Sequence, residues 1–506
     1  MKDRAEEIEN LKERVDDIDR RQFLKAAGIA GGTAGALGIV WYGTRDDEPT
    51  EVPPDDDDPP DPPEIPPDDD EPPEEPPPEE PPEVDEVPFI DEFETVIDVT
   101  EEGADPEGRE PINHLFQEFA DDRTLFMFEP GTYRFDPIEL QSRTRVGLVT
   151  DGDEPATFIP NDEGCRGGHP YFNFNYVDGL VIDSIDLDFG QVDSGGPLFM
   201  FLEGESVIRN LSYLGSCSNQ QGVVRVEVPD PNGTALIDNF VTHNTDENHT
   251  LTAVYVSDGH AGELTFQNCS IDNFSDNGIY ASAPGGPNGN DGVVNVIGGT
   301  FRNNNISNIR LGSTGARAED VTVIVDDQTP GWGQLNSRGI RLRNQEQQEI
   351  HNCDIRFGPE AADSFGAIVF HQANGGARVT DTSIQIDRDG IPAFKAFPPD
   401  DEPETSPVFE NVTVSGDASG GPVAEIAGRP GTVFRDCIIE QPDPNRQGFL
   451  IEGSQGCHFE DCHIEIGQQP FALNSSTVTL ENTRVITQQG ERLIENETFE
   501  NEPVEL

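Results

Sequence analysis

Lysine is almost absent from this sequence. Of its 506 residues only four are lysine, the last of them Lys395, so nearly all of the 31 basic residues are arginine. Against them stand 99 Asp and Glu residues, which give a formal net charge of −68. Nucleic acids and anionic membrane faces are both bound by basic surfaces. This charge balance therefore excludes both as default partners.

The surplus of carboxylates also bears on the protein's environment. A strongly acidic, lysine-poor surface keeps a protein soluble in concentrated salt, where charge repulsion is screened and carboxylates hold hydrated cations. The composition resembles that of haloarchaeal secreted proteins, which implies a halophilic protein. A generic acidic protein is the alternative.

Apolar residues are also scarce, at 34% of the chain, but 29 Phe and 51 Gly do not suit a wholly disordered protein. The chain is longer than the roughly 250–300 residues at which a single compact core stops growing. We therefore expect either several domains or one elongated architecture.

The N-terminus resembles a twin-arginine export signal. Residues 19–25 read Asp-Arg-Arg-Gln-Phe-Leu-Lys, and a moderately apolar, Gly/Ala-rich stretch follows as far as Tyr42. The resemblance implies that the twin-arginine translocase exports the folded protein to an extracellular or cell-surface location. We assign residues 1–45 to a signal peptide or an N-terminal membrane anchor, because about 17 apolar residues lie at the lower limit for spanning a bilayer.

Residues 46–88 are nearly all Pro, Asp and Glu. Proline favours extended polyproline II and like charges repel, so we expect a stiff, solvated spacer or a disordered linker. In either case the segment marks a boundary, and residues 89–506 form one domain.

The start of this domain carries a family resemblance. Residues 103–108 read Gly-Ala-Asp-Pro-Glu-Gly, an amphipathic segment follows at 112–120, and residues 130–133 form a Pro-Gly-Thr-Tyr turn. This order resembles the N-terminal entry of pectate-lyase-like right-handed parallel β-helix proteins. The resemblance implies that segment 112–120 is a helix that caps the first coil.

A short repeat predicts the rest of the fold. An apolar residue, a variable residue, a small polar residue or glycine, and an inward-facing residue recur about 12 times, roughly every 27 residues. Asn, Asp and Gly tolerate the positive φ that a tight bend between two strands requires. The repeat therefore predicts a β-solenoid of roughly 12 or more coils, and the resemblance makes it a right-handed parallel β-helix. An antiparallel propeller is the alternative, and it fits the regular bends less well. Examples of the repeat are Ile208-Arg209-Asn210-Leu211, Ile297-Gly298-Gly299-Thr300 and Phe434-Arg435-Asp436-Cys437.

A second strand follows this repeat in most coils, and its outward positions differ from the acidic remainder of the chain. On successive coils they read Arg225, Tyr255, Tyr280, Arg310 and Arg341. Neighbouring coils lie ~4.8 Å apart. Arg310 beside Arg341 is therefore unfavourable unless an anion neutralises the pair.

Aromatic rings stack on sugar faces, and the arginine fork matches carboxylate or sulfate groups. The row therefore predicts an exposed groove that binds an anionic polysaccharide. The predicted substrate-binding residues are Arg225, Tyr255, Tyr280, Arg343 and His371. The alternative is that the arginines pair with carboxylates of neighbouring loops, which are Asp258, Asp276, Asp326 and Asp327.

Catalysis rests on the resemblance. The lyases of this fold abstract a proton next to a uronate carboxylate with an Arg or Lys base, often with Ca²⁺. Lys395 is expected in a Pro-rich loop, so the resemblance implies Arg310 or Arg341 as the base, Asp276 as a further catalytic candidate, and Ca²⁺ as a conceivable cofactor. The protein is then a surface polysaccharide lyase or hydrolase; a non-catalytic adhesive protein and a structural envelope component are the alternatives.

Two further motifs are weaker. The tripeptide Asn244-Thr245-Asp246 matches one that related polygalacturonases use, but the Asp-Asp pair that should accompany it is missing, and we interpret the match as chance. Residues 457–463 contain two Cys-His pairs that look like a metal motif. Strand alternation sends the cysteines inward and the histidines outward, so one zinc ion cannot bind both, and we expect no metal site.

Four cysteines occupy the inward position of the repeat and should be buried apolar side chains. They are Cys269, Cys353, Cys437 and Cys462.

Overall fold

The computed structural model describes residues 87–161, 170–190, 195–215, 217, 222–245, 251–329, 336–401 and 403–501. The expected export signal and residues 46–86 of the Pro-rich segment lie outside these residues. Within the described ranges, no helix combines the length and the apolar character needed to cross a membrane.

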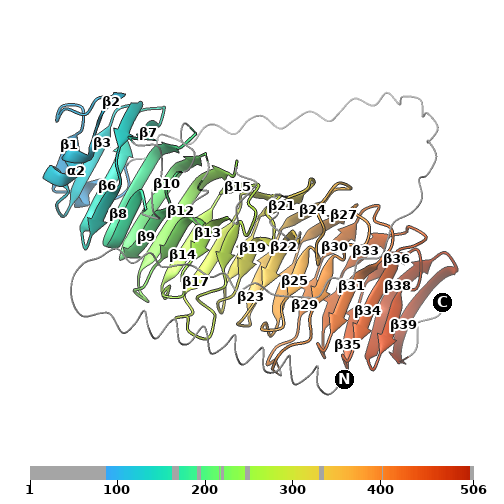
Figure 1. Cartoon of the computed structure of the whole chain (residues 1–506). Helices are drawn as coiled ribbons and strands as arrows, with labels where there is room; N and C mark the ends of the chain where they lie inside the picture. The colour runs from blue at the N-terminus through green and yellow to red at the C-terminus, as the bar shows by residue number, and fades with distance from the viewer. Residues whose placement is uncertain are drawn as a thin grey trace, which may run out of the picture. The chain divides into compact units, whose positions relative to one another are not determined.

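The described chain is a parallel β-solenoid of about 12 turns with very little helix (Figure 1). Each strand pairs in parallel with the strand one coil further along, and the pairings follow three sheets around the coil, which we call A, B and C. The one antiparallel pairing among the described strands joins β38 to the final strand β39 (Gly490–Glu500).

Sheet A is built from short strands on the first side of each coil. It contains β1 (Thr95–Asp98), β3 (Thr124–Phe128), β6 (Thr144–Thr150), β14 (Glu263–Gln267), β17 (Val293–Ile297), β20 (Arg317–Glu319), β23 (Gln348–His351), β26 (Ala377–Thr380), β29 (Val408–Glu410), β32 (Val433–Arg435) and β35 (Cys457–Glu460).

Sheet B follows sheet A after a bend. It contains β2 (Glu107–Pro111), β4 (Gly131–Phe135), β7 (Ala156–Pro160), β15 (Ser270–Asp272), β18 (Thr300–Arg302), β21 (Thr322–Val325), β24 (Asp354–Phe357), β27 (Ser383–Ile386), β30 (Thr413–Ser415), β33 (Ile438–Gln441) and β36 (His463–Ile466). Four long strands run through the bends and join the sheets. They are β8 (Phe172–Asp188), β10 (Glu205–Leu214), β12 (Thr234–His243) and β38 (Thr477–Thr487).

Sheet C carries the row of arginine and tyrosine residues. It contains β5 (Ile138–Gln141), β9 (Leu198–Glu203), β11 (Gly222–Glu227), β13 (Thr252–Val256), β16 (Ile279–Ala281), β19 (Ser307–Leu311), β22 (Arg338–Leu342), β25 (Ile368–Phe370), β28 (Phe394–Ala396), β31 (Pro422–Ala427), β34 (Gln447–Glu452) and β37 (Phe471–Asn474). The second strand that the sequence predicts after each repeat corresponds to a strand of sheet C, and this prediction is therefore confirmed.

The bend between sheets A and B has positive φ in every coil that carries the repeat, as predicted. One coil departs from the expected register: Ile297 pairs with Gln267, so the bend falls on Gly298 rather than Gly299. Gly299 stacks on the coil position that Cys269 occupies one coil earlier. A Cβ atom at position 299 would overlap the backbone of Cys269, so only glycine fits there. The bend residues are Ser184, Asn210, Asn239, Asn268, Gly298, Asp320, Asn352, Asp381, Asn411, Asp436, Asp461 and Asn482.

Side chains at this bend form a ladder from coil to coil. The Nδ2 atom of Asn239 donates to Oδ1 of Asn210 at 2.9 Å, and that of Asn352 donates to Oδ1 of Asp320 at 2.6 Å. These hydrogen bonds satisfy the polar side chains and fix the stacking register.

The interior is a continuous apolar stack. Phe409, Phe434 and Phe459 lie nearly parallel on successive coils, with ring centroids 4.4 and 4.6 Å apart. The four cysteines of the repeat are buried and unpaired, as predicted.

Segment 112–120 contains a short helix, α2 (Asn113–Phe119), close to β1 and β3 in Figure 1. Its buried residues are Leu115 and Phe116, and the Phe116 ring lies 4.8 Å from that of Phe126. That this helix caps the first coil stays a prediction. The single-turn 3₁₀ helix η1 (Ile90–Glu92) precedes β1.

Candidate functional site

The predicted row exists as one register line across sheet C. Arg225 pairs with Tyr255, Tyr255 with Tyr280, Tyr280 with Arg310, and Arg310 with Arg341. We call these five residues the sheet C row. Their side chains point away from the apolar interior, because each position alternates with a buried neighbour on the same strand.

The exposure of the row differs from the expectation. The sequence predicts an open groove, but Tyr280, Arg310 and Arg341 are only 8%, 3% and 2% exposed. Arg225 and Tyr255 are partly exposed. The accessible part of the row is therefore its N-terminal end, and the two candidate bases lie at the covered end.

Arg310 is covered because neighbouring side chains wrap around it. Its Nε donates to Oγ of Ser282 at 2.7 Å, and a terminal nitrogen donates to the hydroxyl of Tyr280 at 3.0 Å. The guanidinium carbon lies 3.9 Å from the centre of the Tyr280 ring. Contacts of this kind compensate in part for burying the charge.

Asp276 supplies the negative charge at this end. Burial raises the pKa of its carboxyl group, and the positive charges of Arg310 and Arg341 act in the opposite direction without cancelling that effect. The carboxylate also accepts a hydrogen bond from Nδ2 of Asn277 at 2.6 Å. Of the four loop carboxylates named above, Asp326 instead pairs with Arg302 at 2.8 Å.

The N-terminal end has a carboxyl group of its own. Glu227 follows Arg225 by two residues on β11, and burial raises its pKa, although Arg225 and a hydrogen bond with Ser257 oppose the shift. The Nε atom of Arg225 donates to Oγ of Ser257 at 2.8 Å. Glu227 is not among the predicted site residues, but strand alternation places it on the same outward face as Arg225.

Arg343 and His371 lie just after β22 and β25, on adjacent coils next to Arg341. His371 is 6% exposed, and its Nδ1 accepts a hydrogen bond from the backbone N–H of Ala373 at 3.1 Å. Both residues have additional interactions, as do Tyr255, Tyr280 and Arg341. Their role in binding stays a prediction.

The expectation for Lys395 was wrong. It lies on β28, not in a loop, and continues the row two coils beyond Arg341. Its Nζ forms an ion pair with Glu425 at 3.0 Å and lies 4.9 Å from the centre of the Phe365 ring. The Pro-rich context indicated a loop, but cross-strand pairing overrides local composition.

Of the tripeptide that matches related polygalacturonases, the structure describes Asn244 and Thr245, and Asn244 has a structural role. Asn244 is buried and donates to the backbone carbonyl of Asn273 at 3.0 Å. Gly259-His260 also resembles a Gly-His pair of those enzymes, and His260 is fully buried: its Nδ1 accepts a hydrogen bond from the Val228 N–H at 3.1 Å, and its Nε2 donates to the Val293 carbonyl at 3.0 Å. Burial lowers the pKa of His260, which is therefore a neutral side chain that links three coils.

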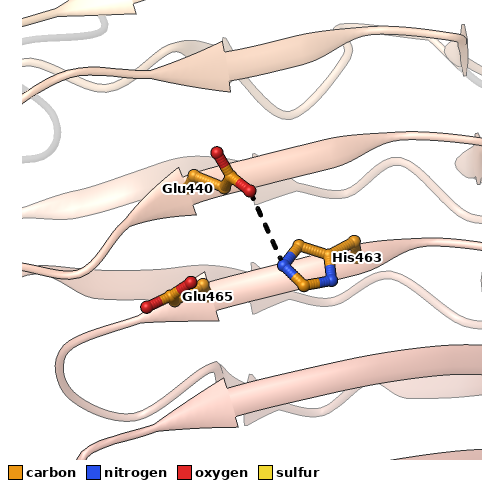
Figure 2. Close-up of side chains that lie close together, drawn as sticks. All are labelled: Glu440, His463 and Glu465. Carbon is orange, nitrogen blue, oxygen red and sulfur yellow. Dashed lines mark ion pairs between the residues drawn. The ribbon is translucent and has the colours of Figure 1, made fainter.

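The two Cys-His pairs behave as strand alternation predicts. Cys457 and Cys462 are buried, whereas His458 and His463 lie on the outer face. His463 has Glu440 and Glu465 nearby, with its Nε2 3.7 Å from a Glu440 oxygen (Figure 2). This is the one group of three potential metal ligands found in the described part of the chain.

A polar depression lies on sheet A, and none of its lining residues is among the predicted site residues. Its volume is about 470 Å³. Within it, Nδ2 of Asn295 donates to a Glu263 carboxylate oxygen at 2.8 Å. The lining residues are Glu263, Val293, Asn295, Gly315, Arg317, Gln347 and Glu349.

Together, the three parallel sheets and the repeated bend define this chain as a parallel β-solenoid protein, as predicted. No protein-family model matches it, and no curated protein matches it in sequence. Several solved structures are similar to it over most of its length. One is the Streptococcus pneumoniae surface adhesin PfbA, which is 12% identical with a TM-score of 0.39, over 78% of this chain and 100% of that one.

Two more are enzymes. The A-module of the Azotobacter vinelandii mannuronan C-5 epimerase AlgE4 is 13% identical with a TM-score of 0.31, over 75% of this chain and 97% of that one. An exopolygalacturonase from Thermotoga maritima is 11% identical with a TM-score of 0.21, over 80% of this chain and 94% of that one. Similarities this low carry no argument about activity, so function must be argued from the residues.

Proposed function

We propose that this protein binds an anionic polysaccharide along sheet C. The observation that carries the proposal is the continuous row of arginine and tyrosine side chains in a chain whose net charge is −68. Of this row, Arg225 and Tyr255 are accessible without rearrangement of the chain. They supply the two contacts that an acidic sugar needs, a guanidinium for its acid group and a ring for its apolar face.

Cleavage of the bound polysaccharide is the second part of the proposal. A general acid or base works best when its pKa lies near the working pH. The pKa values of Glu227 and Asp276 are both raised by burial, and each carboxyl group lies beside arginines of the row. A lyase would use Arg310 or Arg341 as base, as proposed from the resemblance, and would need the covered end of the row to open to the polysaccharide. A hydrolase would use the carboxyl groups.

Calcium does not fit the row on the residues described. Ca²⁺ takes six to eight oxygen ligands, and the described part of sheet C brings no three acidic or histidine side chains together. Asp276 faces the positive charges of Arg310 and Arg341, which oppose a cation there. We derive no catalytic step through calcium.

The location of the protein is part of the same proposal. We propose that the solenoid is right-handed. We also propose that residues 1–45 direct export by the twin-arginine translocase to the cell surface or the extracellular space, and that residues 46–88 act as a spacer that holds the solenoid away from its attachment point. The support for export and location is the Arg-Arg motif, the Pro/Asp/Glu-rich composition and an acidic, lysine-poor composition that resembles that of halophilic proteins. The support for right-handedness is the resemblance at residues 103–133. A non-catalytic adhesive or structural envelope protein is the alternative.

The test is to incubate the purified protein, in concentrated salt, with a panel of uronate-containing, sulfated and neutral polysaccharides. Co-sedimentation measures binding, absorbance of unsaturated uronate reveals elimination, and new reducing ends without that absorbance reveal hydrolysis. Binding with neither product supports the adhesive alternative. Failure to bind any acidic polysaccharide would contradict the proposal.

A further inference from the structure

Tyr176 has a conformation that an aromatic residue rarely adopts. Its φ is 56°, in the left-handed region that favours Gly and Asn. The pairing of β8 with β9 shifts register between Asn175 and Val177, so Tyr176 is the extra residue of a bulge. Bulges re-aim side chains, and backbone strain of this kind clusters at ligand-binding sites.

The side chain of Tyr176 is correspondingly exposed. At 45% it is the one aromatic residue among the large apolar side chains exposed in the described chain. Its ring centre lies 6.3 Å from that of Phe201, and Phe199 and Phe201 lie 6.3 Å apart at an interplanar angle of 30°. Phe199 and Phe201 are partly exposed on β9. Because the Tyr176 ring is tilted by 46° to that of Phe201, the three rings form an angled aromatic surface on the outside of sheet C, which we call the platform.

This platform continues the sheet C row. Phe199 pairs with Arg225 in the register of β9 and β11. The guanidinium carbon of Arg225 lies 5.3 Å from the Phe201 ring, 5.9 Å from Phe199 and 6.0 Å from Tyr255. Three rings therefore surround one cation at the accessible end of the row.

Arg225 is held in a defined position. Its Nε donates a hydrogen bond to Oγ of Ser257, and among the described residues its terminal nitrogens have no hydrogen-bond acceptor. These nitrogens form the planar edge of the guanidinium fork, which matches the two oxygens of an acid group. The charge and the rings thus face the same partly exposed region.

We infer that Tyr176, Phe199, Phe201 and Arg225 form a subsite for one pyranose ring that carries an acidic group. The sugar ring lies on the aromatic platform, and its carboxylate or sulfate accepts hydrogen bonds from Arg225. This inference rests on the proposed function and adds the residues that select an acidic sugar at the N-terminal end of the row. Positive φ at Tyr176 costs the fold free energy, and sugar binding explains why a tyrosine occupies that bend.

The test uses Tyr176→Asn and Phe201→Leu in the full chain. Asparagine suits the left-handed bend, so Tyr176→Asn should keep or raise the melting temperature while weakening binding of an acidic oligosaccharide about fivefold. Phe201→Leu keeps an apolar side chain without the aromatic face and should weaken binding by a similar factor. The matched control is Ser142→Asn, at the corresponding bend one coil earlier, where φ is 50°; it should leave binding unchanged.

The probes are a uronate oligosaccharide, a sulfated oligosaccharide and a neutral one of equal length, measured by titration calorimetry. The acidic probe that the wild type prefers over the neutral probe identifies which acid group the subsite takes. Both variants should weaken binding of this probe but keep the preference over the neutral probe, because they remove stacking and leave Arg225 in place. Normal binding of acidic probes by both variants would overturn the subsite and leave the proposed function standing. A wild-type protein that binds neither acidic probe would overturn both.

Discussion

The guanidinium of Arg310 lies over the ring of Tyr280, one coil earlier, and also donates a hydrogen bond to the hydroxyl group of that tyrosine. At the covered end of the sheet C row, residues of the row therefore contact one another. A row of outward residues expected to serve a ligand contributes here to the packing of successive coils.

Replacing Arg310 should destabilise the protein. Arg310→Ala removes two hydrogen bonds of a charged group and leaves Asp276 with less compensation, so we expect a loss of about 2–4 kcal/mol in the free energy of unfolding. Chemical denaturation in concentrated salt measures it. Glu460→Ala is the control, because its ion pair with Arg435 is partly solvent-accessible and should contribute no more than about 1 kcal/mol. Equal, small effects of both changes would show that the row does not support the fold.

Asp276 should give the protein a specific pH dependence. Its pKa is raised in the folded state, so the folded protein binds this proton more tightly than the unfolded chain does. The resulting stabilisation is complete below the unfolded pKa of 3.8 and is lost as pH rises through the higher folded value.

Asp276→Asn removes this titration. Relative to the wild type, the variant should therefore gain stability as pH rises from about 4 towards neutrality. Melting temperatures of both proteins across that range measure the difference, and Asp258→Asn serves as the control in a neighbouring loop. A pH-independent difference between wild type and Asp276→Asn would contradict the assignment.

Arg429 should be among the most sensitive positions in the chain. It is fully buried and donates to the carbonyl oxygens of Phe397, His371 and Asn374, at 2.9, 2.9 and 2.6 Å, as well as to that of Gly375. Burial lowers its pKa to about 10, so it remains charged at neutral pH.

Arg429→Met should cost about 3 kcal/mol or more, because it leaves several buried carbonyl groups without donors. Arg429→Lys should recover only part of this loss, since a lysine cannot reproduce the planar fork. Unfolding by denaturant tests both variants. Wild-type stability of Arg429→Met would show that these carbonyl groups are satisfied in some other way.

The sequence predicted the coil well because the bend is a local property. Residues such as Asn210 and Asp436 tolerate positive φ, and their regular spacing determines which side chains face the interior. The same alternation correctly placed Arg310 beside Arg341. The shift at Gly298 was missed because two consecutive glycines fit either register.

The exposure of the row could not be predicted in this way. Whether Arg341 is open or covered depends on loops and neighbouring side chains, which follow no repeat. Alternation also places Glu227 outward beside Arg225, but it was not predicted as a site residue because its raised pKa results from burial, a property of the folded protein. Tyr176 was missed because its sequence gives no sign of the bulge that turns it outward.

The most direct test of the central claim is a comparison of Arg225→Gln with Arg435→Gln in binding to an acidic polysaccharide. Both changes remove one outward positive charge, but only Arg225 belongs to the sheet C row, whereas Arg435 pairs with Glu460 on sheet A. Titration calorimetry in the salt that keeps the protein folded should show affinity reduced about tenfold by Arg225→Gln, equivalent to a charged hydrogen bond of about 1.5 kcal/mol, and unchanged by Arg435→Gln. Equal affinity of both variants and the wild type, with folding intact, would contradict the claim that this row binds the polysaccharide.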